Sequence, residues 1–157
     1  MSKKYTRGAK RKLRNIEQNL IGMTKDFPKN FHNGGYAFKL PANQQFVHGL
    51  DNKGKKRIAS CLIDRATHLR NNKLQQCYKV AILLFPQEFW RSEIVIFEND
   101  MYYKDFFYRQ NPWQVWREVK KSKYQKIIQI GWDIKIFEEI IDDDEQQQQT
   151  FICYIER

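Results

Sequence analysis

The 157-residue sequence lacks several features that would tie it to a membrane or divide it into parts. No apolar run approaches the ~20 residues of a membrane-spanning helix. The N-terminus is basic but has no apolar core of the kind that a signal peptide carries. No internal repeat or linker divides the chain, and its length is typical of one domain. We therefore expect residues 1–157 to form a single soluble, cytoplasmic domain with no membrane partner.

The motifs of common cofactor and catalytic sites are also missing. There is no Gly-x-Ser-x-Gly, no Walker loop and no Gly-x-Gly-x-x-Gly, so neither a hydrolase nucleophile nor a nucleotide-binding loop is indicated. The cysteines are odd in number, with no Cys-x-x-Cys pair, which is typical of reduced, mostly buried cytoplasmic thiols. Because no histidine or cysteine has structural-zinc spacing, we predict no metal and no cofactor. The residues concerned are Cys61, Cys77, Cys153, His32, His48 and His68.

The densest apolar runs lie at the centre of the chain. Residues 80–85 and 94–97 are continuous apolar runs, rich in β-branched and aromatic side chains and too short for free-standing helices. Pro86 ends the first run because it has no N–H to offer a sheet. We predict two buried antiparallel strands, joined by a loop over residues 86–91 and packed by helices on at least one face.

Periodic patterns elsewhere predict the remaining elements. Apolar residues three and four apart predict helices over 7–27 and 55–73. Alternating apolar residues predict a strand over 36–40. A last pair of strands is predicted over 136–141 and 150–155. The fold class is therefore α+β, with a mainly antiparallel sheet of about five strands packed by two to four helices.

Other segments have weaker patterns. Residues 43–54 are polar and rich in turn formers, which predicts a loop. Asn111-Pro112 is typical of a helix start, and the helix would run to about residue 121. We expect residues 1–6 to be frayed and residues 142–149, four acids followed by glutamines, to form a mobile loop.

Positive charge is concentrated near the N-terminus. The net charge is +10, residues 1–14 carry seven Lys or Arg and no acid, and residues 137–157 carry seven acids and one Arg. A basic excess favours polyanions such as nucleic acid, although charged runs also simply face water. Cations in the first turn of the second helix oppose its dipole. We interpret them as solvated at a small cost in stability, although such a conflict can mark a site for an anion from elsewhere. The candidate nucleic-acid-binding residues are Lys3, Lys4, Arg7, Lys10, Arg11, Lys12, Arg14, Lys55, Lys56 and Arg57.

Aromatic residues make up 15% of the chain. Exposed rings offer stacking faces for unpaired bases, whereas buried rings fill a core. The candidates for an aromatic surface are Trp90, Trp113 and Trp116, with Phe89, Tyr102, Tyr103 and Tyr108 beside them in the sequence.

One group of polar residues has the spacing of a small site. Asp64 and His68 are four apart on the second helix, so the carboxylate could orient the imidazole as a general base. Arg65 and His68 could instead bind a phosphate or carboxylate. The structural alternative is a polar cluster that pins the helix. We assign no catalytic residue, and keep these three as the candidates if the protein is an enzyme.

The middle of the chain holds four distinctive stretches, which are residues 61–69 (Cys-Leu-Ile-Asp-Arg-Ala-Thr-His-Leu), 85–86 (Phe-Pro), 90–97 (Trp-Arg-Ser-Glu-Ile-Val-Ile-Phe) and 102–109. In pattern and order they resemble a family of uncharacterised bacterial proteins, a domain of unknown function. The resemblance implies a compact cytoplasmic α+β domain, and it brings no catalytic residues with it.

These observations together predict a non-catalytic binding module of the bacterial cytoplasm. Nucleic acid is the expected partner, bound through the basic N-terminal helix. A protein-interaction module, such as a toxin-neutralising partner or an assembly subunit, is the first alternative. An enzyme that uses Asp64, Arg65 and His68 is the second.

Overall fold

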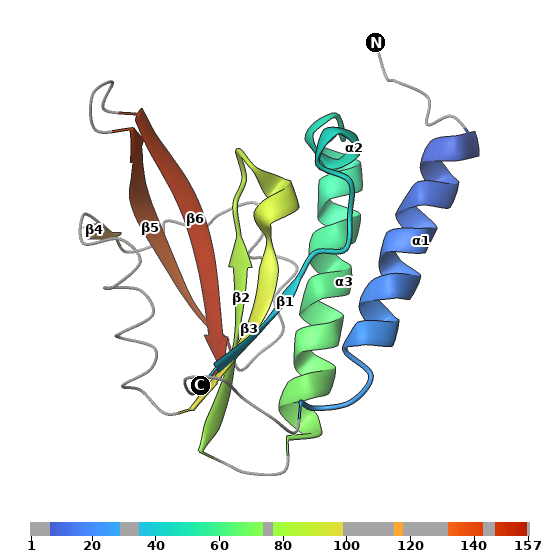
Figure 1. The fold of residues 1–157 in the computed structure, drawn as a ribbon. Coiled ribbons are helices and arrows are strands. Elements are labelled where there is room, and N and C mark those ends of the chain that lie inside the picture. Colours follow the sequence, from blue (N-terminus) through green and yellow to red (C-terminus); the bar gives the residue numbers. More distant parts are fainter. Residues whose placement is uncertain are drawn as a thin grey trace.

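The computed structural model describes residues 7–28, 35–73, 77–98, 115–117, 132–142 and 147–156. Its helices are α1 (Arg7–Met23), α2 (Gln44–His48), α3 (Asn52–Asn71) and the short 3-10 helix η1 (Phe89–Arg91). Its strands are β1 (Gly35–Lys39), β2 (Tyr78–Leu84), β3 (Glu93–Glu98), β4 (Val115–Arg117), β5 (Trp132–Asp142) and β6 (Gln147–Glu156). These strands form one antiparallel sheet in the order β1-β3-β2-β6-β5-β4, with α1 and α3 side by side on one face (Figure 1). The predicted α+β class is confirmed.

The two central apolar runs form β2 and β3, as the sequence predicts. They are neighbours in the sheet, with Ile82 opposite Ile94. The connection between them contains η1, which the sequence pattern did not indicate. Ser92 closes this connection, because its hydroxyl accepts a hydrogen bond from the backbone N–H of Phe85 at 3.3 Å.

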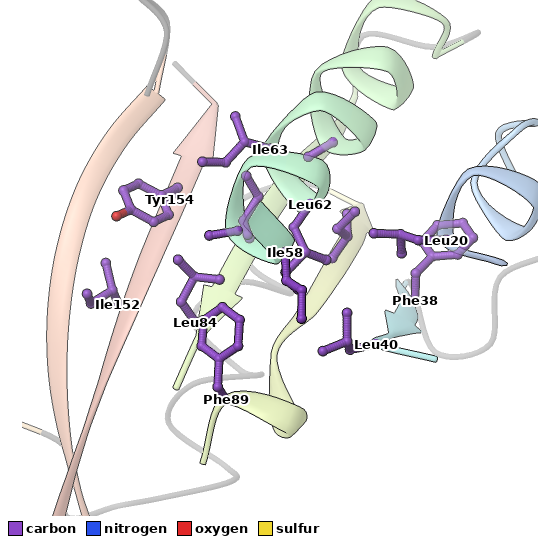
Figure 2. Close-up of a cluster of buried hydrophobic side chains, with 14 of the residues drawn as sticks. Leu20, Phe38, Leu40, Ile58, Leu62, Ile63, Leu84, Phe89, Ile152 and Tyr154 are labelled. Carbon is purple, nitrogen blue, oxygen red and sulfur yellow. The ribbon is translucent and has the colours of Figure 1, made fainter. Parts of the chain in front are cut away.

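The main core lies between the helices and the sheet (Figure 2). The helix stripe predicted in α1 is confirmed at Leu13, Ile16 and Leu20, which are buried there. Met23 was also predicted to face the core but is 40% exposed, and the helix ends at Met23 and not at the predicted residue 27. From α3, Ile58, Leu62 and Ile63 point toward the strands, which supply Leu84, Ile152 and Tyr154, with Phe89 from η1. These contacts fix α1 and α3 over the sheet.

The opposite face of the sheet centre is buried as well. It carries a second cluster made of Ala81, Leu83, Phe85, Val95, Phe97 and Cys153. Because β2 is buried on both faces, its sequence is a continuous apolar run and does not alternate with polar residues.

Two helix starts differ from the sequence prediction. Helix α2 lies inside the predicted loop 43–54, because the Asn43 side chain caps it by accepting from Phe46 N at 3.1 Å. Helix α3 begins at Asn52 and not at Lys55. In both cases an Asn or Asp cap was read as a loop residue.

Three strands also differ from the prediction. Residues 115–117 form β4, so the helix predicted from Asn111-Pro112 is wrong at these positions. Pairing of β4 with β5 overrides the local helix signal, and Val and Trp both favour strands. Strands β5 and β6 extend further than predicted into 142–149, with Asp142 opposite Gln147. Residues 1–6 and 143–146 lie outside the described residues, as does the rest of the predicted helix.

Within the described ranges, no helix has the length and apolar character needed to cross a bilayer.

Candidate nucleic-acid interface

Helices α1 and α3 are parallel neighbours. Three contacts join the two segments, and later residues on the α1 side pair with later residues on the α3 side. The two helices therefore run in the same direction (Figure 1). These contacts are the ion pair Glu17–Arg57, the hydrogen bond from Arg65 Nε to Thr24 Oγ1 at 2.8 Å, and the bond between His68 Nε2 and the Lys25 carbonyl oxygen at 2.9 Å. The N-terminal halves of both helices therefore lie at the same end of the molecule.

This arrangement gathers two basic segments that are far apart in the sequence. We call the following eight residues the basic surface: Lys10, Arg11, Lys12, Arg14, Lys53, Lys55, Lys56 and Arg57. All are exposed except Lys55, which is half-buried. Lys12 also contacts α2, with Nζ 5.4 Å from the centroid of the Phe46 ring. Most of the predicted basic residues are thus brought together, from α1 and α3.

Only two acids interrupt these segments. Residues 8–20 contain Glu17 as their single acid, and residues 51–60 contain Asp51. Glu17 is paired with Arg57, and Asp51 accepts a hydrogen bond from Gly54 N at 2.8 Å. The other cations therefore keep a strong positive excess.

The Asp51 contact also bears on whether the N-terminus of α3 binds an anion from outside the chain. From the sequence, solvated cations are the preferred interpretation of this helix start, and an anion from outside is the alternative. Asp51 is the N-cap of α3, so a carboxylate of the chain itself already occupies that end. Positive charge for a ligand comes from the side chains and not from the helix terminus. The early start also adds Lys53, which was missed because the cap was not recognised in the sequence.

The structure describes no side chain for the remaining basic candidates. Arg7 is the first residue of α1. Lys3 and Lys4 lie outside the described residues.

The predicted aromatic surface is only partly described. Phe89 is 1% exposed, so the expectation that it stacks on bases is wrong. Trp90 is half-buried and packs against the main core. Trp116 belongs to β4, whereas Trp113 lies outside the described ranges, as do Tyr102, Tyr103 and Tyr108.

The ring of Phe46, which Lys12 contacts, lies beside the basic surface but is half-buried. In the described part of the chain, the exposed large apolar side chains are Ile21, Met23 and Tyr36, and none belongs to the basic surface. Contacts from these eight residues would therefore go to phosphates and not to base faces.

Arg65 and His68 are used to hold the end of α1. Arg65 bonds the Thr24 hydroxyl and also its carbonyl oxygen, at 3.2 Å. His68 bonds the Lys25 carbonyl through Nε2, which must donate, so Nδ1 is left to accept from Asn72 Nδ2 at 3.3 Å. Asp64 is exposed and has no hydrogen bond or ion pair within the described residues. The spacing of Asp64 and His68 therefore does not produce an Asp–His hydrogen bond.

The cysteines and histidines do not gather. Among the described residues, no group of three or more His, Cys, Asp or Glu side chains has the geometry of a metal site. None of the three cysteines forms a disulfide, and Cys77 is exposed, unlike the buried thiols that we expected. Burial, followed by the nearby Glu17 and Asp64 carboxylates, raises the pKa of Cys61 to about 11. Cys61 is therefore a protonated packing residue and not a nucleophile at neutral pH.

Comparisons with known proteins show the family of the chain but add no activity. Neither the curated proteins nor the solved structures gave a match. A family model matches residues 17–156, which includes α3 and all six strands and begins within α1, after Arg14. The resemblance to a domain of unknown function is therefore confirmed. The chain belongs to the family described as "Protein of unknown function (DUF3916)".

Proposed function

We propose that the protein is a non-catalytic binding module of the bacterial cytoplasm, and that its basic surface binds the phosphate backbone of nucleic acid. One observation carries the proposal. The parallel packing of α1 and α3, marked by the Glu17–Arg57 pair across 40 residues of sequence, puts two basic segments with mostly exposed side chains at the same end of the molecule.

The chemistry of this surface favours a polyanion over a small anion. Its cations are spread over two helices and are mostly exposed, so each one can meet a separate phosphate. Exposed single charges bind a small anion weakly because water screens them. A phosphate backbone gains from many such contacts at once, since every contact releases a condensed counterion.

The expected binding is independent of base sequence. Phosphate contacts position a protein on nucleic acid but carry no sequence information. Single strands and duplexes should therefore both bind, and affinity should fall steeply with salt.

The test is fluorescence anisotropy with labelled single- and double-stranded oligonucleotides of mixed sequence. Lys10→Gln/Arg14→Gln removes two exposed cations that lie four residues apart on one side of α1. Lys25→Gln/Lys39→Gln removes the same charge at exposed positions outside the basic surface. The control separates local contacts from the effect of net charge.

We expect the α1 variant to weaken binding about tenfold or more at low salt, and the control to change it much less. Equal losses in both variants would contradict the proposal, because net charge alone would then explain binding. Absence of binding by the unchanged protein at low salt would overturn it and leave protein interaction as the function to test.

A further inference from the structure

A separate group of polar side chains lies where α3 faces β5 and β6. Thr67 and Arg70 are three residues apart on α3 and so lie on one side of it. Ile63, one turn earlier, extends from α3 toward Tyr154 of β6 (Figure 2). The Arg70 guanidinium carbon lies 5.0 Å from the centroid of the Trp132 ring of β5. This group is on the opposite side of α3 from the contacts with α1.

Among the described residues, two buried polar atoms in this group have no hydrogen-bond partner. They are the hydroxyl oxygen of Thr67 and the indole nitrogen of Trp132, a residue that is only 4% exposed. Arg70 stacks on Trp132 and makes no hydrogen bond or ion pair among the described residues. A buried donor without an acceptor is destabilising, and native proteins satisfy nearly all such groups.

The three side chains are complementary to an acceptor. The indole N–H and the guanidinium can only donate, and the Thr67 hydroxyl can donate as well. Glu156, which is opposite Trp132 in the sheet, is already engaged. Its Oε1 accepts from Lys73 Nζ at 2.5 Å and from Val80 N at 3.3 Å. The site therefore has one unneutralised cation and several donors.

We propose that Thr67, Arg70 and Trp132 bind a small molecule through a carboxylate or phosphate group. The planar fork of a guanidinium matches the oxygens of either group, and the two neighbouring donors add direction. Arg70 is half-buried, whereas the Thr67 hydroxyl oxygen and the Trp132 indole nitrogen are buried atoms, so an anion would enter beside Arg70. The proposal does not depend on nucleic-acid binding.

The test follows the indole N–H signals of the full chain by NMR after labelling tryptophan with ¹⁵N. Trp132→Phe identifies the Trp132 signal. Sodium phosphate and sodium acetate are then added in separate titrations, with sodium chloride keeping the ionic strength constant. We expect the Trp132 signal to move and to saturate with one or both anions. The anion that saturates first identifies the ligand class.

Variants distinguish this site from other anion contacts. Arg70→Gln and Thr67→Val should each weaken the anion's effect on the Trp132 signal about tenfold or more. Thr67→Val should fold well, since it removes a buried hydroxyl for which the described part of the chain provides no partner. Lys53→Gln/Lys56→Gln should leave the titration unchanged, because those cations belong to the basic surface.

Two results would overturn the proposal. The first is a Trp132 signal that moves with neither anion. The second is a Trp132 signal that moves as much in the Arg70→Gln variant as in the unchanged protein.

Discussion

Arg65 of α3 donates a hydrogen bond to the hydroxyl of Thr24, 2.8 Å away, at the end of α1. The same hydroxyl donates to the Leu20 carbonyl oxygen at 2.6 Å, so it links Arg65 to the last turn of α1. A cation at a helix C-terminus is also favourable for the helix dipole. This contact, together with Glu17–Arg57, sets the parallel alignment of the two helices.

Thr24→Val should therefore destabilise the protein by about 1–3 kcal/mol, because the Arg65 Nε–H loses its acceptor and the Leu20 carbonyl keeps only the hydrogen bond from the Thr24 backbone N–H. Urea unfolding followed by circular dichroism measures the change. Thr24→Ser keeps the hydroxyl and should lose much less. Similar losses for Val and Ser would contradict the role given to the hydroxyl.

Asp51 allows helix capping to be separated from surface charge. Asp51→Ala removes the cap of α3 and should cost about 1 kcal/mol in the free energy of unfolding. Asp51→Asn keeps a capping oxygen, so stability should change little, but it removes one negative charge beside the basic surface. We expect this variant to bind nucleic acid more tightly, as measured by anisotropy. Weaker binding by a stable Asp51→Asn protein would count against the proposed interface.

Much of the fold could be predicted from local patterns. The three-and-four spacing of Leu13, Ile16 and Leu20 located α1, and the double-sided burial of β2 follows from its unbroken apolar sequence. Strand β4 could not be predicted, because its pairing partner is in β5, about 20 residues further along the chain.

The candidate interface was only half visible in the sequence. The cations of α1 stand out as a run, but their meeting with those of α3 depends on parallel helix packing, which no local pattern shows. Lys53 was missed for a local reason, since Asp51 was read as a loop residue. The pairing of Arg65 with Thr24 was also not visible, because 41 residues separate them.

The Glu93 carboxyl should make the free energy of unfolding depend on pH. Burial raises the pKa of this carboxyl, and the nearby Lys39 and Arg91 oppose the shift less strongly. A carboxyl with a raised folded-state pKa stabilises the fold in its protonated form, and this contribution is lost as the pH rises through that pKa. Glu93→Gln should therefore raise the urea midpoint at pH 7, and the gain should shrink as the pH falls toward about 4.

Glu88→Gln is the matched control for Glu93→Gln. Glu88 pairs with Arg91 at 3.3 Å in a partly exposed setting, so its loss should leave stability within about 1 kcal/mol and give no gain at pH 7. A Glu93→Gln protein that is less stable than the unchanged chain at pH 7 would contradict this account of the buried carboxyl.

The cysteines should differ in reactivity. At pH 8 iodoacetamide should modify the exposed Cys77 first, whereas Cys61 should react slowly because its pKa is raised to about 11. Mass spectrometry of the intact protein and of its peptides follows the reaction. Cys77→Ser should abolish the fast phase and Cys61→Ser should not, and the reverse pattern would be inconsistent with the structure.

The most direct test of the central claim is the salt dependence of nucleic-acid binding. The claim is that α1 and α3 form one surface. The logarithm of the binding constant is measured against the logarithm of salt concentration for Lys10→Gln/Arg14→Gln, for Lys53→Gln/Lys56→Gln and for the fourfold variant. If the two helices form one surface, each double variant should make the slope shallower by about 2, and the fourfold variant should make it shallower by about 4. An unchanged slope for the α3 pair would contradict it.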